Sequence, residues 1–98
     1  MLTRVNSEPT SILNVSVTTS ATGANYTAFG SQGCYTLEVF NFSGVALEFR
    51  RGATGTVIQV PHGYSKVFKA ITNASNIDCR RVDLQNTPVT IYAEAWVS

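Results

Sequence analysis

Two alternating apolar runs joined by a turn signal are the feature that most constrains the fold of this chain. They occupy residues 35–51, and the polar break at residues 41–44 ends in Gly44, a residue type that easily adopts a positive φ. Side chains alternate between the two faces of a strand, so this pattern predicts a β-hairpin with one buried face. The side chains predicted to fill the core are Tyr35, Leu37, Val39, Val45, Leu47 and Phe49.

Alternation recurs in short segments on both sides of this hairpin, with turn-forming residues between them. No window of the sequence has the apolar spacing of a helix. The pattern predicts an all-β fold, namely a small antiparallel β-sandwich of about seven strands, with a jelly-roll or Ig-like arrangement. The other predicted strands are residues 11–19, 56–60, 64–71, 76–82 and 89–97.

The predicted organisation is one domain with an extended arm. Residues 1–10 are mostly polar, contain Pro9 and lack periodicity, so they are expected to form an extended N-terminal arm. Residues 11–98 are expected to form a single β-sandwich domain that includes a long loop at 20–33. No apolar run is long enough for a signal peptide or a membrane span, so we expect the protein to stay where it is made.

The composition narrows the class of protein. The 98 residues carry a formal net charge of +1, 44% are hydrophobic and only 13% are charged. The hydrophobic content excludes a disordered chain. A general nucleic-acid-binding protein would show a dominant basic face, and a net charge of +1 gives no reason to expect one. A surface this poor in charge favours coverage by partner subunits.

Large apolar residues lie on both faces of the hairpin and of the last predicted strand, although a lone small domain needs only one buried face. We expect Phe40, Phe42, Tyr92 and Trp96 to lie on the face away from the core. Exposed apolar patches mark protein–protein interfaces, so these residues are candidates for a subunit contact. The alternative, which the sequence leaves open, is that the arm or the 20–33 loop folds back over them.

Two pairs of adjacent arginines, Arg50-Arg51 and Arg80-Arg81, lie in or at the end of predicted strands. Neighbours on a strand point to opposite faces, so one arginine of each pair is expected to face the core. A buried guanidinium is tolerated only when it is paired, for example with a carboxylate. We predict that Arg80 or Arg81 pairs within the chain, with Asp78, Asp83 or Glu48. The alternative is contact with an acidic surface of another subunit, and Arg50 and Arg51 are therefore included in the candidate interface.

The sequence contains no recognisable catalytic or metal-binding constellation. Its single histidine, His62, lies in a Pro-His-Gly turn, and the acidic residues are scattered. Cys34 and Cys79 lack the paired spacing of metal ligands, and no nucleophile motif surrounds them. Without a secretion signal they are expected to be reduced, although pairing between them stays open. We predict a non-enzymatic protein with no catalytic residue, metal ion or cofactor.

Four segments together carry a resemblance to a known class of proteins. They are Leu-Glu-Val-Phe-Asn-Phe-Ser-Gly-Val-Ala-Leu-Glu-Phe-Arg-Arg-Gly at 37–52, Val-Pro-His-Gly-Tyr-Ser at 60–65, Ile-Thr-Asn-Ala-Ser-Asn-Ile-Asp-Cys-Arg-Arg-Val-Asp at 71–83 and Thr-Pro-Val-Thr-Ile-Tyr-Ala-Glu at 87–94. In overall pattern and turn placement, residues 35–96, nearly two thirds of the chain, resemble small virion structural proteins of tailed bacteriophages, of the capsid cement or decoration type.

This resemblance implies a compact β-sandwich that attaches to the capsid exterior and stabilises the shell of major capsid protein. It also implies synthesis in the host cytoplasm, a final location on the virion surface, and a homo-oligomer with the trimer as the favoured state, without nucleic-acid or membrane partners. Within the virion, the alternatives are a head–tail connector, tail or fibre component. An alternative of another class is a carbohydrate-binding β-sandwich module, in which Trp96, Tyr64 and Tyr92 would form an open stacking platform.

Overall fold

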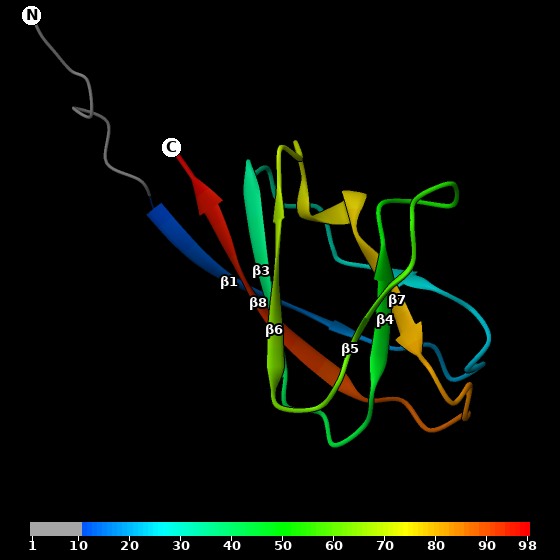
Figure 1. Ribbon diagram of the computed structural model, residues 1–98. Helices are drawn as coiled ribbons and strands as arrows, with labels where there is room; N and C mark the ends of the chain where they lie inside the picture. The colour runs from blue at the N-terminus through cyan, green and yellow to red at the C-terminus, as the bar shows by residue number, and fades with distance from the viewer. Residues whose placement is uncertain (1–10) are drawn as a thin grey trace, which may run out of the picture.

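Two four-stranded antiparallel sheets pack against each other in the computed structural model, which describes residues 11–98 (Figure 1). The first sheet has the strand order β1-β8-β3-β6, and the second has the order β2-β7-β4-β5. In this part of the chain no helix is long and apolar enough to cross a membrane. The predicted arm at residues 1–10 lies outside the described residues.

Short strands make up both sheets, as the sequence pattern predicts. The first sheet contains β1 (Ser11–Thr18), β8 (Thr90–Val97), β3 (Thr36–Asn41) and β6 (Tyr64–Lys69). The second sheet contains β2 (Thr27–Ala28), β7 (Asp78–Arg81), β4 (Leu47–Arg50) and β5 (Ile58–Val60). One turn of 3-10 helix, η1 (Ala74–Asn76), precedes β7.

The chain crosses between the two sheets at every connection except the one that joins β4 to β5. Together with the strand order, these crossings are the arrangement of two Greek keys in an eight-stranded jelly roll. The predicted all-β sandwich is therefore confirmed, with eight strands where about seven were expected. The additional strand is β2, which lies in the segment expected to be a loop and pairs with β7.

The hairpin predicted for residues 35–51 is wrong, because its two arms belong to different sheets. Strand β3 pairs with β6 and β8, whereas β4 pairs with β5 and β7. The buried side chain of Asn41 helps fix the crossing, since its Nδ2 donates to the carbonyls of Val45 and Val60 at 2.8 and 2.7 Å. The two strands therefore meet through their apolar faces across the core and share no hydrogen-bond ladder.

The core lies between the sheets and contains the inward side chains that alternation predicts. Each large apolar side chain that is fully buried stabilises the fold by about 1.5–3 kcal/mol. Phe49 of β4 packs against Phe68 of β6, with ring centroids 6.1 Å apart, and this contact joins the two sheets. Four of the six predicted core residues are fully buried: Leu37, Val39, Leu47 and Phe49.

The other two predicted core residues lie at the margin of the sandwich. Tyr35 is 41% exposed, so its assignment to the core is wrong. It precedes β3 at the end of the sheet, where its N–H donates to the carbonyl of Trp96. Val45 packs only partly against the core, because it lies in the crossing between the sheets.

Candidate interaction surface

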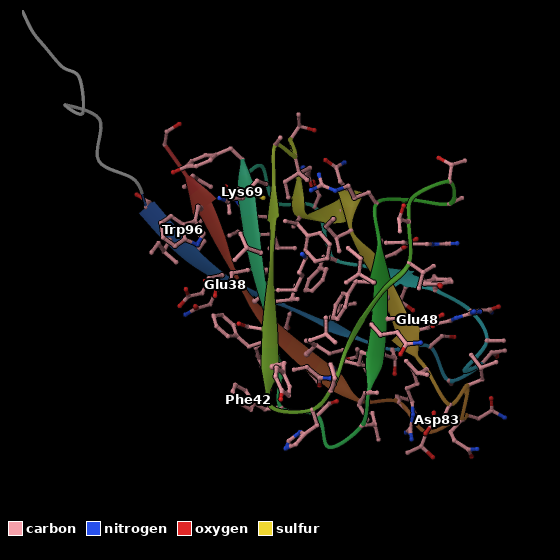
Figure 2. All side chains as sticks on the ribbon, viewed as in Figure 1. Glu38, Phe42, Glu48, Lys69, Asp83 and Trp96 are labelled. Atoms are coloured by element: carbon pink, nitrogen blue, oxygen red, sulfur yellow. The ribbon has the colours of Figure 1, made fainter. Side chains whose placement is uncertain are left out.

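The outer face of the first sheet gathers the aromatic residues that the sequence singles out. Phe40 of β3 lies directly opposite Tyr92 of β8, and Trp96 of β8 lies opposite Ile12 of β1. Directly opposite residues of an antiparallel pair share one face. We call Phe40, Phe42, Tyr92 and Trp96 the aromatic face. Figure 2 shows Phe42 and Trp96 beside the first sheet, with Glu38 between them.

Two rings of the aromatic face are open to solvent. Phe42 is 71% exposed and Tyr92 is 66% exposed, whereas Phe40 and Trp96 are half-buried. Asn14 and Glu94 join Phe40, Phe42, Tyr92 and Ala93 around a shallow groove of about 510 Å³. The 20–33 segment does not cover this face, because it pairs with β7 in the other sheet. The alternative that this segment folds over the aromatic residues is therefore wrong, and the same alternative for the arm lies outside the described residues.

The turn after β3 holds Phe42 in place. The Oδ1 atom of Asn41 accepts hydrogen bonds from the N–H and Oγ–H of Ser43 at 3.1 and 2.6 Å. Gly44 has a φ of 91°, and its N–H donates to Nδ1 of His62 at 2.9 Å. The rings of His62 and Phe42 lie nearly perpendicular to each other, with centroids 6.3 Å apart. An exposed ring fixed in this way loses little conformational freedom when a partner binds it.

Two glutamates interrupt the aromatic face, and the sequence interpretation did not include them. Glu38 of β3 lies directly opposite Glu94 of β8, and like charges in this position destabilise a sheet. Neither carboxylate forms a salt bridge with another described residue. The signal was present in the sequence, because alternation places Glu94 on the same face as Tyr92 and Trp96.

A second groove, of about 350 Å³, lies next to Trp96 at the other end of this face. Its walls include Tyr35, Glu38, Val67 and Lys69. The indole Nε1–H of Trp96 is buried and finds no acceptor among residues 11–98. A buried donor without a partner costs about 1–3 kcal/mol, so packing of the indole ring must offset this cost.

The structure separates Arg50 and Arg51 from the aromatic face, because Arg50 is the last residue of β4 in the second sheet and Arg51 directly follows it. Arg50 forms a two-pronged contact with Asp78, at 2.9 and 3.3 Å, and its Cζ lies 3.5 Å from the centre of the Tyr26 ring. Arg51 donates to the carbonyl of Lys69 at 2.8 Å. The guanidinium of Arg50 is thus occupied within the chain, whereas Arg51 is exposed.

The prediction that Arg80 or Arg81 pairs within the chain is confirmed for both. The Arg80–Glu48 pair has an N–O distance of 2.6 Å, and the Arg81–Asp83 pair has one of 2.7 Å. Tyr26 also donates from its hydroxyl to Glu48 at 2.7 Å. Burial alone would raise the pKa of Glu48, but the hydrogen bonds from Tyr26 and Arg80 outweigh it and lower that pKa. This cluster anchors the 20–33 segment on the second sheet.

The residues considered for catalysis are dispersed. His62 is exposed in a turn, where its Nδ1 accepts the hydrogen bond from Gly44. Cys34 and Cys79 are both buried free thiols. Burial raises the pKa of both thiols. For Cys79, burial and the negative charge of Asp78 together raise the pKa to about 12. Within residues 11–98, no three His, Cys, Asp or Glu side chains are grouped so that they could hold a metal ion.

Comparisons with known proteins add no relative from which a role could be transferred. No family model, no curated protein and no solved structure matches this chain.

Proposed function

We propose that this protein is a non-enzymatic structural subunit of a phage virion, and that it cements the capsid by binding the major capsid protein through its aromatic face. It would be made in the host cytoplasm and end on the capsid surface as a homo-oligomer. The sequence resemblance over residues 35–96 supports the virion role. The exposed aromatic face supports binding of a protein partner.

The observation that carries this proposal is the exposure of Phe42 and Tyr92 on a rigid sheet. Aromatic residues are enriched in protein interfaces and often dominate the binding energy there. Here they flank a groove on a face with a backbone fixed by two neighbouring strands and a hydrogen-bonded turn. Binding would therefore require little reordering of the chain.

A cement protein needs only a modest contact from each copy. When several copies are linked, binding of one raises the effective concentration of the others, so overall attachment exceeds the affinity of a single contact. A small aromatic face repeated over a shell fits this requirement. A connector, tail or fibre protein could use the same face, so the two virion roles differ in the number of copies that each particle carries.

The carbohydrate-binding alternative receives less support from the geometry. Tyr64 lies opposite Asn41, which is buried and points into the sandwich, so Tyr64 does not share the outer face with Tyr92. The platform of Trp96, Tyr64 and Tyr92 that this alternative requires is therefore not assembled. Specific binding on a glycan array would nevertheless favour this alternative over the capsid contact.

The proposal is tested by binding of the purified protein to capsids that lack it. Co-sedimentation should show hundreds of copies per particle, whereas six or twelve copies would favour a connector or tail role. The double variant Phe42→Ser/Tyr92→Ser should weaken binding at least about tenfold, because aromatic anchors commonly contribute more than 1 kcal/mol each. Tyr64→Ser is the control, since it removes an equally exposed ring from outside the aromatic face. Equal binding by all three proteins would contradict the proposal.

A further inference from the structure

The four outermost strands of the two sheets differ in how well their edges are protected. An outermost strand exposes unpaired backbone groups, and proteins protect such edges by keeping them short or by placing lysine or proline there. Strand β2 has two residues, and β5 has three and is followed by Pro61. Strand β6 carries the exposed Lys66 and Lys69.

Strand β1 has none of these protections. Its eight residues, Ser-Ile-Leu-Asn-Val-Ser-Val-Thr, include no charged residue, proline or glycine. It is an outermost strand of the first sheet and pairs only with β8 among the described strands (Figure 1). A long, uncharged edge of this kind is a template for another strand.

The hydrogen bonds show which groups of β1 face the open edge. The N–H of Thr19 donates to the carbonyl of Val89 at 2.9 Å, at the end of the ladder between β1 and β8. Antiparallel ladders alternate between bonded and non-bonded pairs, so odd-numbered residues of β1 bond β8. The 2.9 Å contact between the hydroxyls of Thr18 and Thr90 fits a non-bonded pair, in which side chains lie closer. The residues with backbone groups that face the edge are Ile12, Asn14, Ser16 and Thr18.

We propose that β1 pairs antiparallel with β1 of a second copy of this chain, about a two-fold axis at Val15. Ile12 of one copy then bonds Thr18 of the other, and Asn14 bonds Ser16. In this register the backbone N–H and C=O groups of every edge-facing residue of β1 find a hydrogen-bond partner in the other copy. The pairing requires no residue before Ser11. The two four-stranded sheets become one continuous sheet across the dimer.

The side chains of β1 are complementary to themselves in this register. On the inner face, Leu13 is 39% exposed and Val15 is half-buried. The pairing places Leu13 opposite Val17 of the other copy, and Val15 opposite its own equivalent, so apolar side chains cover one another. On the outer face, Asn14 meets Ser16. Because β1 carries no charge, no like charges face each other across the axis.

This pairing uses the edge of the first sheet and leaves the four rings of the aromatic face free, although Asn14 belongs to both surfaces because it also lines the groove beside Tyr92. It also replaces the trimer that the sequence resemblance implies with a two-fold dimer. Both aromatic faces then lie on the same side of one continuous sheet. The dimer would present them together to a partner, whatever that partner is.

The oligomeric state of the isolated protein tests the proposal without any capsid. Light scattering should give twice the monomer mass at high concentration, and the amides of Ile12, Asn14, Ser16 and Thr18 should exchange more slowly in the dimer. Asn14→Lys/Ser16→Lys places lysine opposite lysine twice and should give a monomer. Gln59→Lys/Ser65→Lys adds the same charge at the edges of β5 and β6 and should stay dimeric. A wild-type monomer or trimer, or a dimeric Asn14→Lys/Ser16→Lys variant, would overturn the proposal.

Cysteine cross-linking tests the register. Val15 and its equivalent would form a non-bonded pair with a Cα–Cα distance of about 4.5 Å, within the range of about 4.4–6.8 Å that a disulfide needs. Val15→Cys should therefore yield a covalent dimer under mild oxidation. Asn14→Cys should not, because its equivalent lies diagonally across the axis. The wild type, with Cys34 and Cys79 buried, is the blank. Cross-linking through Asn14→Cys in place of Val15→Cys would overturn the Val15-centred pairing.

Discussion

Asn41 offers a sharp test of how the two sheets are joined. Its buried amide, at the end of β3 in the first sheet, donates to the carbonyl of Val45 in the crossing to β4 and to that of Val60 in β5 of the second sheet. The substitution Asn41→Asp keeps the shape of the side chain but removes its N–H₂ donor. The carbonyls of Val45 and Val60 would then face a carboxylate oxygen in place of a donor. The hydrogen bond from the N–H of Ser43 to Oδ1 remains possible, so the variant isolates the loss of the two donated bonds.

The expected magnitude follows from the count of partners. Two lost hydrogen bonds cost about 1 kcal/mol each. The carbonyl of Val45 keeps the hydroxyl of Ser43 at 3.1 Å. The carbonyl of Val60 keeps the N–H of Leu47, because the bond from Val82 N–H to the Ala46 carbonyl turns the even-numbered residues of β4 toward β7 and Leu47 toward β5. We expect a loss of about 2 kcal/mol in the free energy of unfolding, before any cost of burying the charge. Such a loss lowers Tm by about 8–16 °C in a domain of this size.

Urea unfolding followed by far-ultraviolet circular dichroism, at one fixed protein concentration, measures this loss. With a slope of about 1–3 kcal/mol per molar urea, the midpoint should fall by about 0.7–2 M. The control is Asn25→Asp, which adds the same charge at an exposed position and should change stability by no more than about 0.5 kcal/mol. A cost below about 1 kcal/mol for Asn41→Asp, or an equal loss in both variants, would contradict this role of the Asn41 amide.

Three further predictions concern the ion pair of Glu48, the close packing at Gly23 and the repulsion between Glu38 and Glu94. The pKa of Glu48 is lowered from its ordinary value of 4.5, so its contribution to stability should be present above that pH and decline as the pH falls through the folded-state pKa. Glu48→Gln should therefore flatten the loss of stability on acidification, measured by urea unfolding between neutral and acidic pH, and an unchanged slope would contradict this. Gly23→Ala should destabilise the fold by at least about 1–3 kcal/mol, because a Cβ there would lie 2.1 Å from the carbonyl oxygen of Gln85. Gly30→Ala, where a Cβ meets open space, is the matched control, and equal Tm values for the two variants would count against the clash. Glu38→Gln should raise stability by about 0.2–1 kcal/mol by removing the repulsion from Glu94, and the gain should shrink as salt is added.

Much of the inside–outside pattern could be predicted from the sequence, because alternation is a local property of a strand. Leu37, Val39, Leu47 and Phe49 were assigned to the core by their spacing alone and are fully buried. The same spacing assigned Tyr92 to the outer face, where it is exposed. Tyr35 broke the rule because its exposure depends on where the sheet ends, and this limit is set by neighbouring strands.

The candidate surface was predicted only in part. Spacing placed Phe40 and Tyr92 on outer faces, but it could not show that they lie opposite each other, because their strands are far apart in the sequence. Glu38 and Glu94 were missed for the same reason, since two separate carboxylates become a pair only in the register of β3 and β8. Arg50 and Arg51 were grouped with the aromatic residues by closeness in the chain, although they belong to the other sheet.

Local patterns in the chain were thus enough to predict that it forms strands, which side of most strands is buried, and that arginines pair with nearby acidic residues. The separation of β3 and β4 into different sheets, and the place of β1 at an edge of the first sheet, emerged only from the packed fold. Alternation reports burial, which each strand expresses through its own side chains. The choice of neighbour depends on backbone hydrogen bonds, which every residue type except proline can form alike.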